Sequence, residues 1–234
     1  MLDELKSEQR WNRFWFFFFL FLAVSKAAFA AHVALPIHRM MTNELRTTAL
    51  LWNGDLECIP ENLTCSFFDA IPTFLPYLEL AVLKVTGSEY IFIYLFAIFG
   101  SICFSLGAYL LGKAVCKSAI GGVLGFICLS ASQLTGNTLG YGFVDWQGVS
   151  APGLVFQSVG LLLLALIYRG QHLLAAILIG LVANLHPVIS FILGGMLVVA
   201  TLAKNCSVRE LTVICVTMSL LAVPAMTKVF ILDF

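Results

Sequence analysis

The chain is 234 residues long, and 60% of its residues are hydrophobic while only 11% are charged. A soluble domain carries about 25% charged residues, so this composition excludes an ordinary soluble globular protein and indicates a polytopic membrane protein. The formal net charge is zero, which excludes partners attracted by overall charge and gives no indication of nucleic-acid binding.

The N-terminal segment predicts a short lead-in followed by a retained membrane span. Residues 1–13 are polar and of mixed charge, which suits a cytoplasmic lead-in, and residues 14–35 form the predicted span 1. This apolar segment is too long and too rich in Phe for a cleaved secretory signal. Lys26 lies inside it and is costly there unless it faces the bundle interior, a water-filled cavity or an anionic partner. It is a candidate for binding substrate or a lipid phosphate, and snorkelling to the interface explains it equally well.

A large polar loop is expected to follow, over residues 36–88. Its acidic residues Glu44, Asp55 and Asp69 could supply a general base or a ligand for a divalent metal. Their spacing matches no metal motif, so solvation of the loop is the favoured interpretation and no metal site is predicted from spacing alone. Arg39, at the start of the loop, is a candidate for holding a phosphate.

Two further features of this loop carry predictions. Cys58 and Cys65 bracket a short polar stretch, and a disulfide between them is favoured if the loop lies on the oxidising side of the membrane. The sequon at Asn62 is a short pattern that carries little weight by itself. Apolar residues at helical intervals over residues 69–85 predict an amphipathic helix at the membrane interface.

Six further apolar segments within residues 90–232 predict spans 2 to 7. Their ranges are 90–112, 118–134, 152–168, 171–185, 188–203 and 211–232. Spans 5 and 6 come from one apolar stretch, residues 171–204, which as a single helix would reach about 50 Å against a hydrocarbon core of about 30 Å. Pro187 removes a backbone donor and favours a tight turn there. His186 in that turn could contact substrate, but capping of backbone groups, shared with Asn184, is the slightly favoured role.

Basic residues indicate which side of the membrane each connection faces. They occupy the short connections between spans 2 and 3, 4 and 5, and 6 and 7, at Lys113, Lys117, Arg169, Lys204 and Arg209. The positive-inside rule therefore predicts a cytoplasmic N-terminus, with the large loop, residues 135–150 and the His186 turn outside. In the second outer loop, Asp145 and Trp146 suit either sugar or head-group binding or an interfacial anchor.

Two stretches give the chain a family resemblance. LPYLELAVLKVTGSEYIFIYLFAIFGSICFSLGAYLLGKAV and LLALIYRGQHLLAAILIGLVANLHP resemble the loop-to-span-2 passage and the short spans 4 and 5 of the membrane glycosyltransferases of the C-type superfamily (GT-C). The resemblance implies a seven-span module with a large first outer loop. It further implies a catalytic Asp or Glu soon after span 1, often with a divalent metal, acting on a sugar linked to polyprenyl phosphate. Here residues 37–41 contain no carboxylate, and the sequence ends at Phe234 without the further spans usual in such enzymes.

The prediction is therefore an all-α polytopic membrane bundle of about seven spans, forming one membrane domain over residues 1–234. Because of the two departures from an enzyme, the first hypothesis for its function is a non-catalytic subunit or scaffold of a larger membrane complex, with membrane lipids and other subunits as partners. The alternative is a glycosyltransferase using a polyprenyl-phosphate-linked sugar at the outer face, with a divalent metal only in that case. A small transporter is a second alternative, which the absence of a repeat disfavours.

Overall fold

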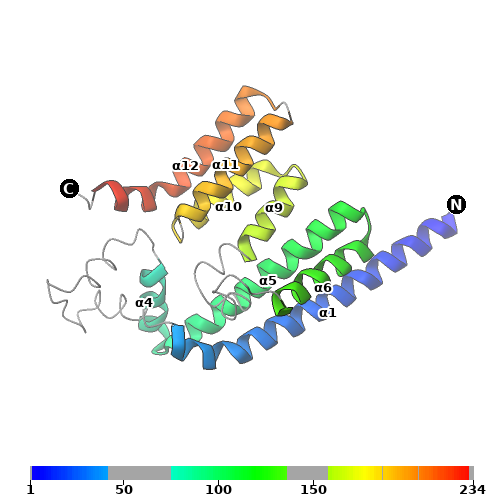
Figure 1. Cartoon of the computed structure of the whole chain (residues 1–234), viewed down its shortest axis with the longest axis horizontal. Coiled ribbons are helices and arrows are strands. Elements are labelled where there is room, and N and C mark those ends of the chain that lie inside the picture. The colour runs from blue at the N-terminus through cyan, green and yellow to red at the C-terminus, as the bar shows by residue number, and fades with distance from the viewer. Residues whose placement is uncertain (1, 42–74, 136–157, 186, 205, 232–234) are drawn as a thin grey trace. The chain divides into compact units, whose positions relative to one another are not determined.

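The structure, a computed structural model, describes residues 2–41, 75–135, 158–185, 187–204 and 206–231 (Figure 1). Within these residues every regular element is a helix and none is a strand, which confirms the all-α prediction. The helices are α1 Leu2–Met41, α4 Leu75–Thr86, α5 Glu89–Cys116, α6 Ala119–Thr135, α9 Gly160–Tyr168, α10 His172–Ala183, α11 Pro187–Ala203 and α12 Val208–Ile231.

The chain divides into two compact units, and each is described by itself. The first unit comprises residues 1–33 and 96–171, and the second comprises residues 34–95 and 172–234. The prediction of one membrane domain stays a prediction.

Helix α1 is longer at both ends than the predicted span. It has 40 residues and includes most of the lead-in as well as residues 36–41, which were expected to open the loop. The lead-in is rich in Leu, Glu, Lys, Gln and Arg, which are strong helix formers, so the helix begins before the apolar segment. Pro36 removes one backbone hydrogen bond without ending the helix.

Helices α5 and α6 form a closely packed hairpin in the first unit. Lys117 adopts a left-handed conformation, with φ 52°, in the turn between them. The Ser118 hydroxyl then accepts a hydrogen bond from the backbone N–H of Gly121 at 3.0 Å and caps the start of α6. A Cβ atom added to Gly125 would lie 2.9 Å from Cα of Gly112, so only glycines permit this approach of the two backbones.

An aromatic cluster joins α1 to this hairpin. The Phe19 ring of α1 stacks on Tyr109 of α5, with 4.3 Å between ring centroids, and meets Phe126 of α6 edge to face at 5.7 Å. All three side chains are buried, and Phe104, Ala108 and Val123 complete the buried cluster. Aromatic pairs in these geometries add to the free energy of burial, so this cluster is the core of the first unit.

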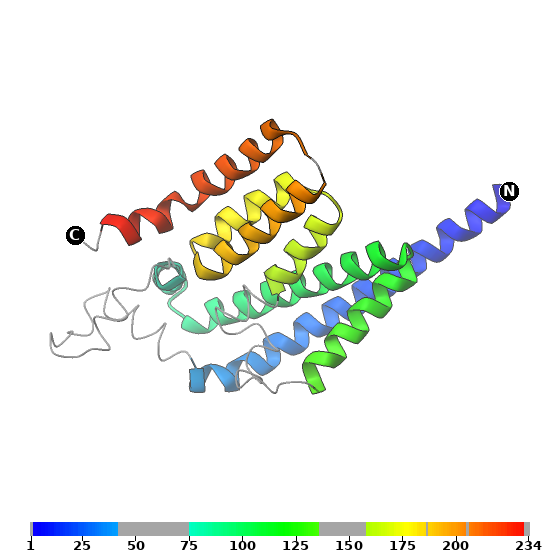
Figure 2. The same cartoon turned by 45° about the horizontal axis from the view of Figure 1, so that its top comes forward.

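In the second unit, α10, α11 and α12 pack side by side (Figures 1 and 2). The apolar stretch from residue 171 to 204 is broken as predicted: α10 ends at Ala183, and α11 begins at Pro187, with Asn184 and Leu185 in a turn. Proline at the first position of a helix needs no backbone donor, which explains why α11 starts there.

Helix α12 starts with a capping box. The Ser207 hydroxyl accepts a hydrogen bond from the Glu210 backbone N–H at 3.2 Å, and the Glu210 carboxylate accepts one from the Ser207 backbone N–H at 2.9 Å. This reciprocal pair satisfies two backbone donors at the helix start. Pro224 lies inside α12, as the sequence predicts.

Two helical stretches of the described residues are long and apolar enough to cross a membrane, Gln9–Phe29 in α1 and Ala97–Cys116 in α5. The other apolar helical stretches are shorter; α10, with 12 residues, is about 18 Å long at 1.5 Å per residue, against a hydrocarbon core of about 30 Å. The structure thus supports a helical protein with two possible membrane-spanning helices. Seven spans and a large first loop stay predictions, because most of that loop lies outside the described residues.

Candidate functional site

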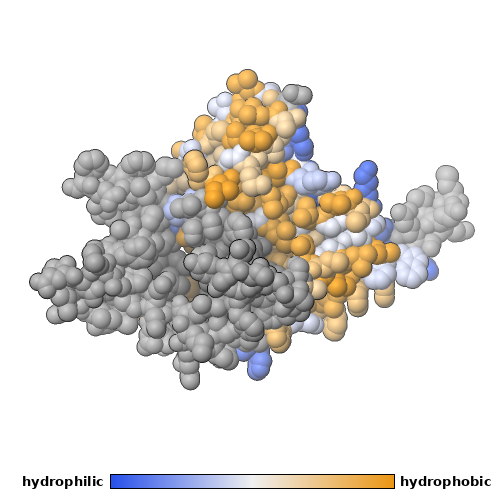
Figure 3. All heavy atoms as spheres, in the orientation of Figure 1, coloured by the Kyte–Doolittle hydropathy of each residue, from blue (hydrophilic) through white to orange (hydrophobic). Residues whose placement is uncertain are grey.

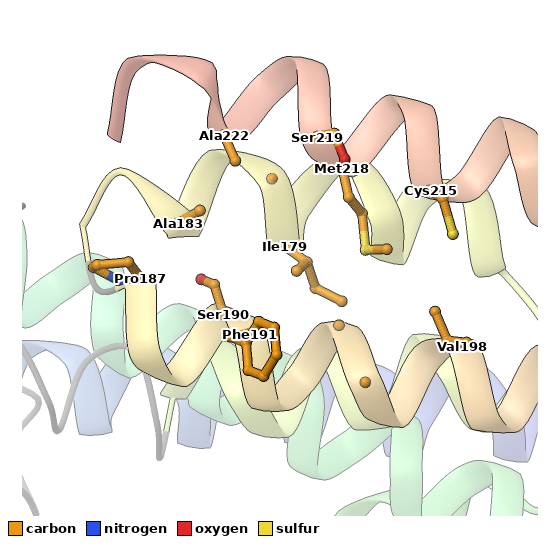
Figure 4. Close-up of a pocket in the computed structure, with 13 residues that line it drawn as sticks. Ile179, Ala183, Pro187, Ser190, Phe191, Val198, Cys215, Met218, Ser219 and Ala222 are labelled. Atoms are coloured by element: carbon orange, nitrogen blue, oxygen red, sulfur yellow. The ribbon is translucent and has the colours of Figure 1, made fainter. Parts of the chain in front are cut away.

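The second unit contains an apolar groove bounded by α10, α11 and α12 (Figure 4). Its volume is about 570 Å³, within the range of about 300–1,000 Å³ that is typical of small-molecule sites. No lining residue carries a charge. The lining residues are Ile179, Gly180 and Ala183 of α10, then Pro187, Ser190, Phe191, Gly194, Gly195 and Val198 of α11, then Cys215, Met218, Ser219 and Ala222 of α12.

The groove runs lengthwise along the helices. Ser190, Gly194 and Val198 are four residues apart on one face of α11, and eight residues of helix span about 12 Å. Figure 4 shows Ala222 of α12 near the Ser190 end and Cys215 near the Val198 end. The site is therefore a long, mainly apolar groove, with Ser190 of α11 at one end and Ser219 of α12 as the second residue that carries a hydroxyl.

Ser190 is the polar group buried at that end. The residue is only 3% exposed, and its Oγ finds no hydrogen-bond partner in the described part of the chain. In Figure 4 its side chain rises from α11 toward the space between the helices. A hydroxyl buried without a partner is unfavourable, so this end of the groove suits a ligand that supplies one.

The space around two glycines shows where the groove is closed and where it is open. A Cβ atom at Gly180 would lie 2.9 Å from the carbonyl oxygen of Met218, so α10 and α12 touch backbone to backbone there. A Cβ atom at Gly195 would meet nothing within 4 Å. The groove is thus closed at the contact between α10 and α12 and open along α11.

Asn184 fixes the end of α10 to α12. Its side-chain amide nitrogen donates to the carbonyl oxygen of Leu221 at 2.9 Å, and to those of Leu181 at 3.2 Å and Gly180 at 3.3 Å. The first bond ties α10 to α12 three residues before Pro224. The capping role favoured for Asn184 is therefore observed. For His186 it stays a prediction, because that residue lies outside the described part of the chain.

In the first unit, Lys26 lies in the aromatic cluster. Its ammonium nitrogen is 3.5 Å from the centroid of the Phe104 ring and 5.9 Å from that of Phe126. A cation over an aromatic face is attracted by the ring quadrupole, most strongly where water is excluded. Lys26 thus faces the bundle interior, which is one of the arrangements expected from the sequence.

The remaining predicted site residues have no described side chain. Arg39 lies in α1, but its side chain is not described. The following residues lie outside the described ranges: Glu44, Asp55, Asp69, Asp145, Trp146, His186, Cys58 and Cys65. Within the described ranges, no three His, Cys, Asp or Glu side chains gather as a metal site would require.

No pattern in the sequence predicted the groove. The small residues Gly194 and Gly195 and the hydroxyl of Ser190 were visible as exceptions in apolar helices. Which helix they face depends on how three helices pack, and a single sequence does not give that packing.

No model of a known protein family, no curated protein and no solved structure matches this chain.

Proposed function

We propose that the chain is a non-catalytic membrane subunit that binds the membrane helix of a partner protein along α1, on a seven-span module resembling GT-C. The observation that carries this proposal is the exposed aromatic face of α1. Phe14, Phe17 and Phe21 share one face of the helix, at intervals of three and four residues, and all are more than half exposed.

Opposite faces of α1 have different environments. Phe19 is buried against Tyr109 and Phe126, so one face of the helix already packs within its own unit. A helix that is apolar on all sides is either buried in a large protein or placed in a membrane. The second placement fits α1, because apolar side chains also cover much of the described surface (Figure 3).

Aromatic composition favours a protein partner over lipid alone on the exposed face. Phe side chains bury a large area and are enriched in the cores of protein interfaces. Leu or Val would serve equally well against acyl chains. The run of Phe16, Phe17, Phe18 and Phe19 therefore suits packing on both sides of α1, against this chain and against a neighbour.

The contact of Lys26 supports a structural role for the intramembrane charge. Its ammonium group lies over Phe104, in the packed core of the first unit. This arrangement stabilises the bundle and does not require a phosphate ligand.

The test is purification from native membranes in a mild detergent, followed by measurement of mass and stoichiometry. We expect a large complex for the wild-type chain and for Phe99→Leu, which changes an exposed aromatic residue of α5. The double variant Phe17→Leu and Phe21→Leu keeps α1 apolar and should release the partner. Equal behaviour of the α1 and α5 variants would contradict the proposal. A wild-type monomer carrying a prenyl phosphate would favour the transferase, with Glu44, Asp55 or Asp69 as its acid.

A further inference from the structure

We infer that the groove between α10, α11 and α12 holds one ester-linked acyl chain of a membrane glycerolipid, with the Ser190 hydroxyl donating to the ester carbonyl. The inference rests on the membrane location in the proposed function, but not on the partner at α1. It assigns a ligand to a different unit of the chain.

The shape of the groove selects a linear apolar ligand. Ser190, Gly194 and Val198 extend along about 12 Å of one face of α11, and only small or apolar groups line the path. Gly195 leaves open space above the helix, which an acyl chain can fill. A partner helix is about 10–12 Å wide with its side chains, so it would lie over the groove instead of entering it.

The burial of the Ser190 hydroxyl favours an acyl chain over a partner helix as the occupant of the groove. Ser190 is 3% exposed, so a helix lying on the surface does not reach its Oγ. A thin chain that enters between α11 and α12 approaches Ser190 from inside the groove that this residue lines. The unpartnered hydroxyl then gains an acceptor, which offsets its burial.

The polar end of the ligand must be neutral. No residue that lines the groove is charged, and a carboxylate or phosphate placed there would lose its hydration without a counter-charge. An ester carbonyl is a neutral acceptor at the head of an acyl chain. Ser190 lies three residues after Pro187, in the first turn of α11, and the ends of membrane helices lie near the depth of lipid ester groups.

The inference is tested with the full chain in lipid nanodiscs that contain a diester phospholipid carrying a photoreactive diazirine in one acyl chain. Peptides labelled after illumination are mapped by mass spectrometry. We expect labelling on α11 and α12 residues of the groove. Gly195→Leu should fill the open space and remove most of that labelling, whereas Ala203→Leu, at an exposed position of the same helix, should leave it unchanged.

Competition between unlabelled lipids distinguishes a hydrogen bond from Ser190 from purely apolar contact. Unlabelled diester lipid should compete better than a dialkyl ether lipid of the same chain length, by about two- to tenfold for one hydrogen bond. Ser190→Ala should abolish this preference while retaining the apolar contacts. Equal competition by both lipids in the wild-type chain would overturn the assigned role of Ser190.

Other outcomes identify other occupants. Cross-links from the groove to a second copy or to another protein, without lipid labelling, would overturn the inference. An unlabelled groove in a chain that still forms a large complex through α1 would overturn the inference and leave the proposed function standing. A labelled groove in a chain that forms no complex would support the inference and overturn the proposed function.

Discussion

At the scale of single residues, Lys26 shows how a charged side chain is accommodated in an apolar helix. Its ammonium group lies 3.5 Å from the centroid of Phe104, a ring that is itself buried. The cation therefore exchanges part of its hydration for the negative face of an aromatic ring. This geometry gives Lys26 a packing role whether or not it also meets other groups.

A double-mutant cycle measures that role. Lys26→Met removes the charge but keeps the apolar stem, and Phe104→Leu removes the ring but keeps the residue apolar. We expect a coupling of about 0.5–2 kcal/mol between the two changes in the free energy of unfolding, measured by denaturant titration in detergent micelles. Strictly additive effects would show that the contact contributes nothing.

At the scale of helices, the contact between α10 and α12 depends on a single missing side chain. Gly180 lies where a Cβ atom would come within 2.9 Å of the Met218 carbonyl oxygen and 2.7 Å of Leu221 Cβ. Asn184, in the turn that follows α10, donates to the Leu221 carbonyl oxygen. Gly180 and Asn184 are four residues apart and both meet α12, so the close approach and the hydrogen bond support each other.

Two glycine substitutions separate close packing from helix propensity. Gly180→Ala forces the backbones apart, and we expect it to lower the free energy of unfolding by about 1–3 kcal/mol. Gly195→Ala meets no atom within 4 Å, and it should raise that free energy by about 0.5–1 kcal/mol because alanine favours the helix. Thermal unfolding in one detergent compares them directly. If both substitutions raised the free energy of unfolding, α10 and α12 would not pack as closely as the contact at Gly180 indicates.

The start of α12 gives a pH-dependent prediction. The pKa of Glu210 is lowered, first by the backbone hydrogen bond from Ser207, then by the Ser207 hydroxyl, with a smaller effect of the charge of His172. The carboxylate is therefore favoured by folding. Its contribution to stability is complete above the ordinary pKa of a glutamate and is lost as the pH falls through the lower pKa of the folded state.

Glu210→Gln isolates this contribution, because glutamine can still complete a capping box but does not titrate. We expect the difference in melting temperature between wild type and variant to be largest near neutral pH. It should shrink on acidification below the ordinary pKa of glutamate, about 4.3. A difference that stays constant with pH would contradict the assignment of the lowered pKa to folding.

The elements could largely be predicted from the sequence, whereas the groove could not. Helix type followed from apolar runs, and Pro187 correctly marked the break between α10 and α11. Helix α1 extends beyond the predicted span at both ends, because good helix formers precede the apolar segment, and the bounds of the span itself stay a prediction. Three-helix packing places Ser190 in the groove that α10, α11 and α12 line, and helical periodicity does not show which neighbouring helix a face meets.

For the molecule as a whole, helix lengths and the positions of basic residues both bear on how many helices cross the membrane. α1 and α5 contain stretches long enough to cross, while α10 with its 12 residues is short. The basic residues around the α5–α6 and α11–α12 turns nevertheless predict, by the positive-inside rule, that both turns lie on the cytoplasmic side. The short length of α10 and this predicted orientation agree only if α10 and α11 cross a thinned part of the bilayer, or if the hairpin enters and leaves on the same side.

Single-cysteine variants decide between these arrangements, because native cysteines already lie beside both basic turns. Cys116 and Cys206 are at least partly exposed, and a membrane-impermeant maleimide should label each of them in cells only after permeabilisation. A Leu185→Cys reporter at the tip of the α10–α11 hairpin should be labelled in intact cells if the hairpin crosses, because seven spans place this tip outside. Labelling of that reporter only after permeabilisation would mean a hairpin that does not cross, and the count of seven spans would then be wrong. Labelling of Cys116 and Cys206 on opposite sides would refute the proposed orientation altogether, since four crossings between them must return the chain to the side from which it started.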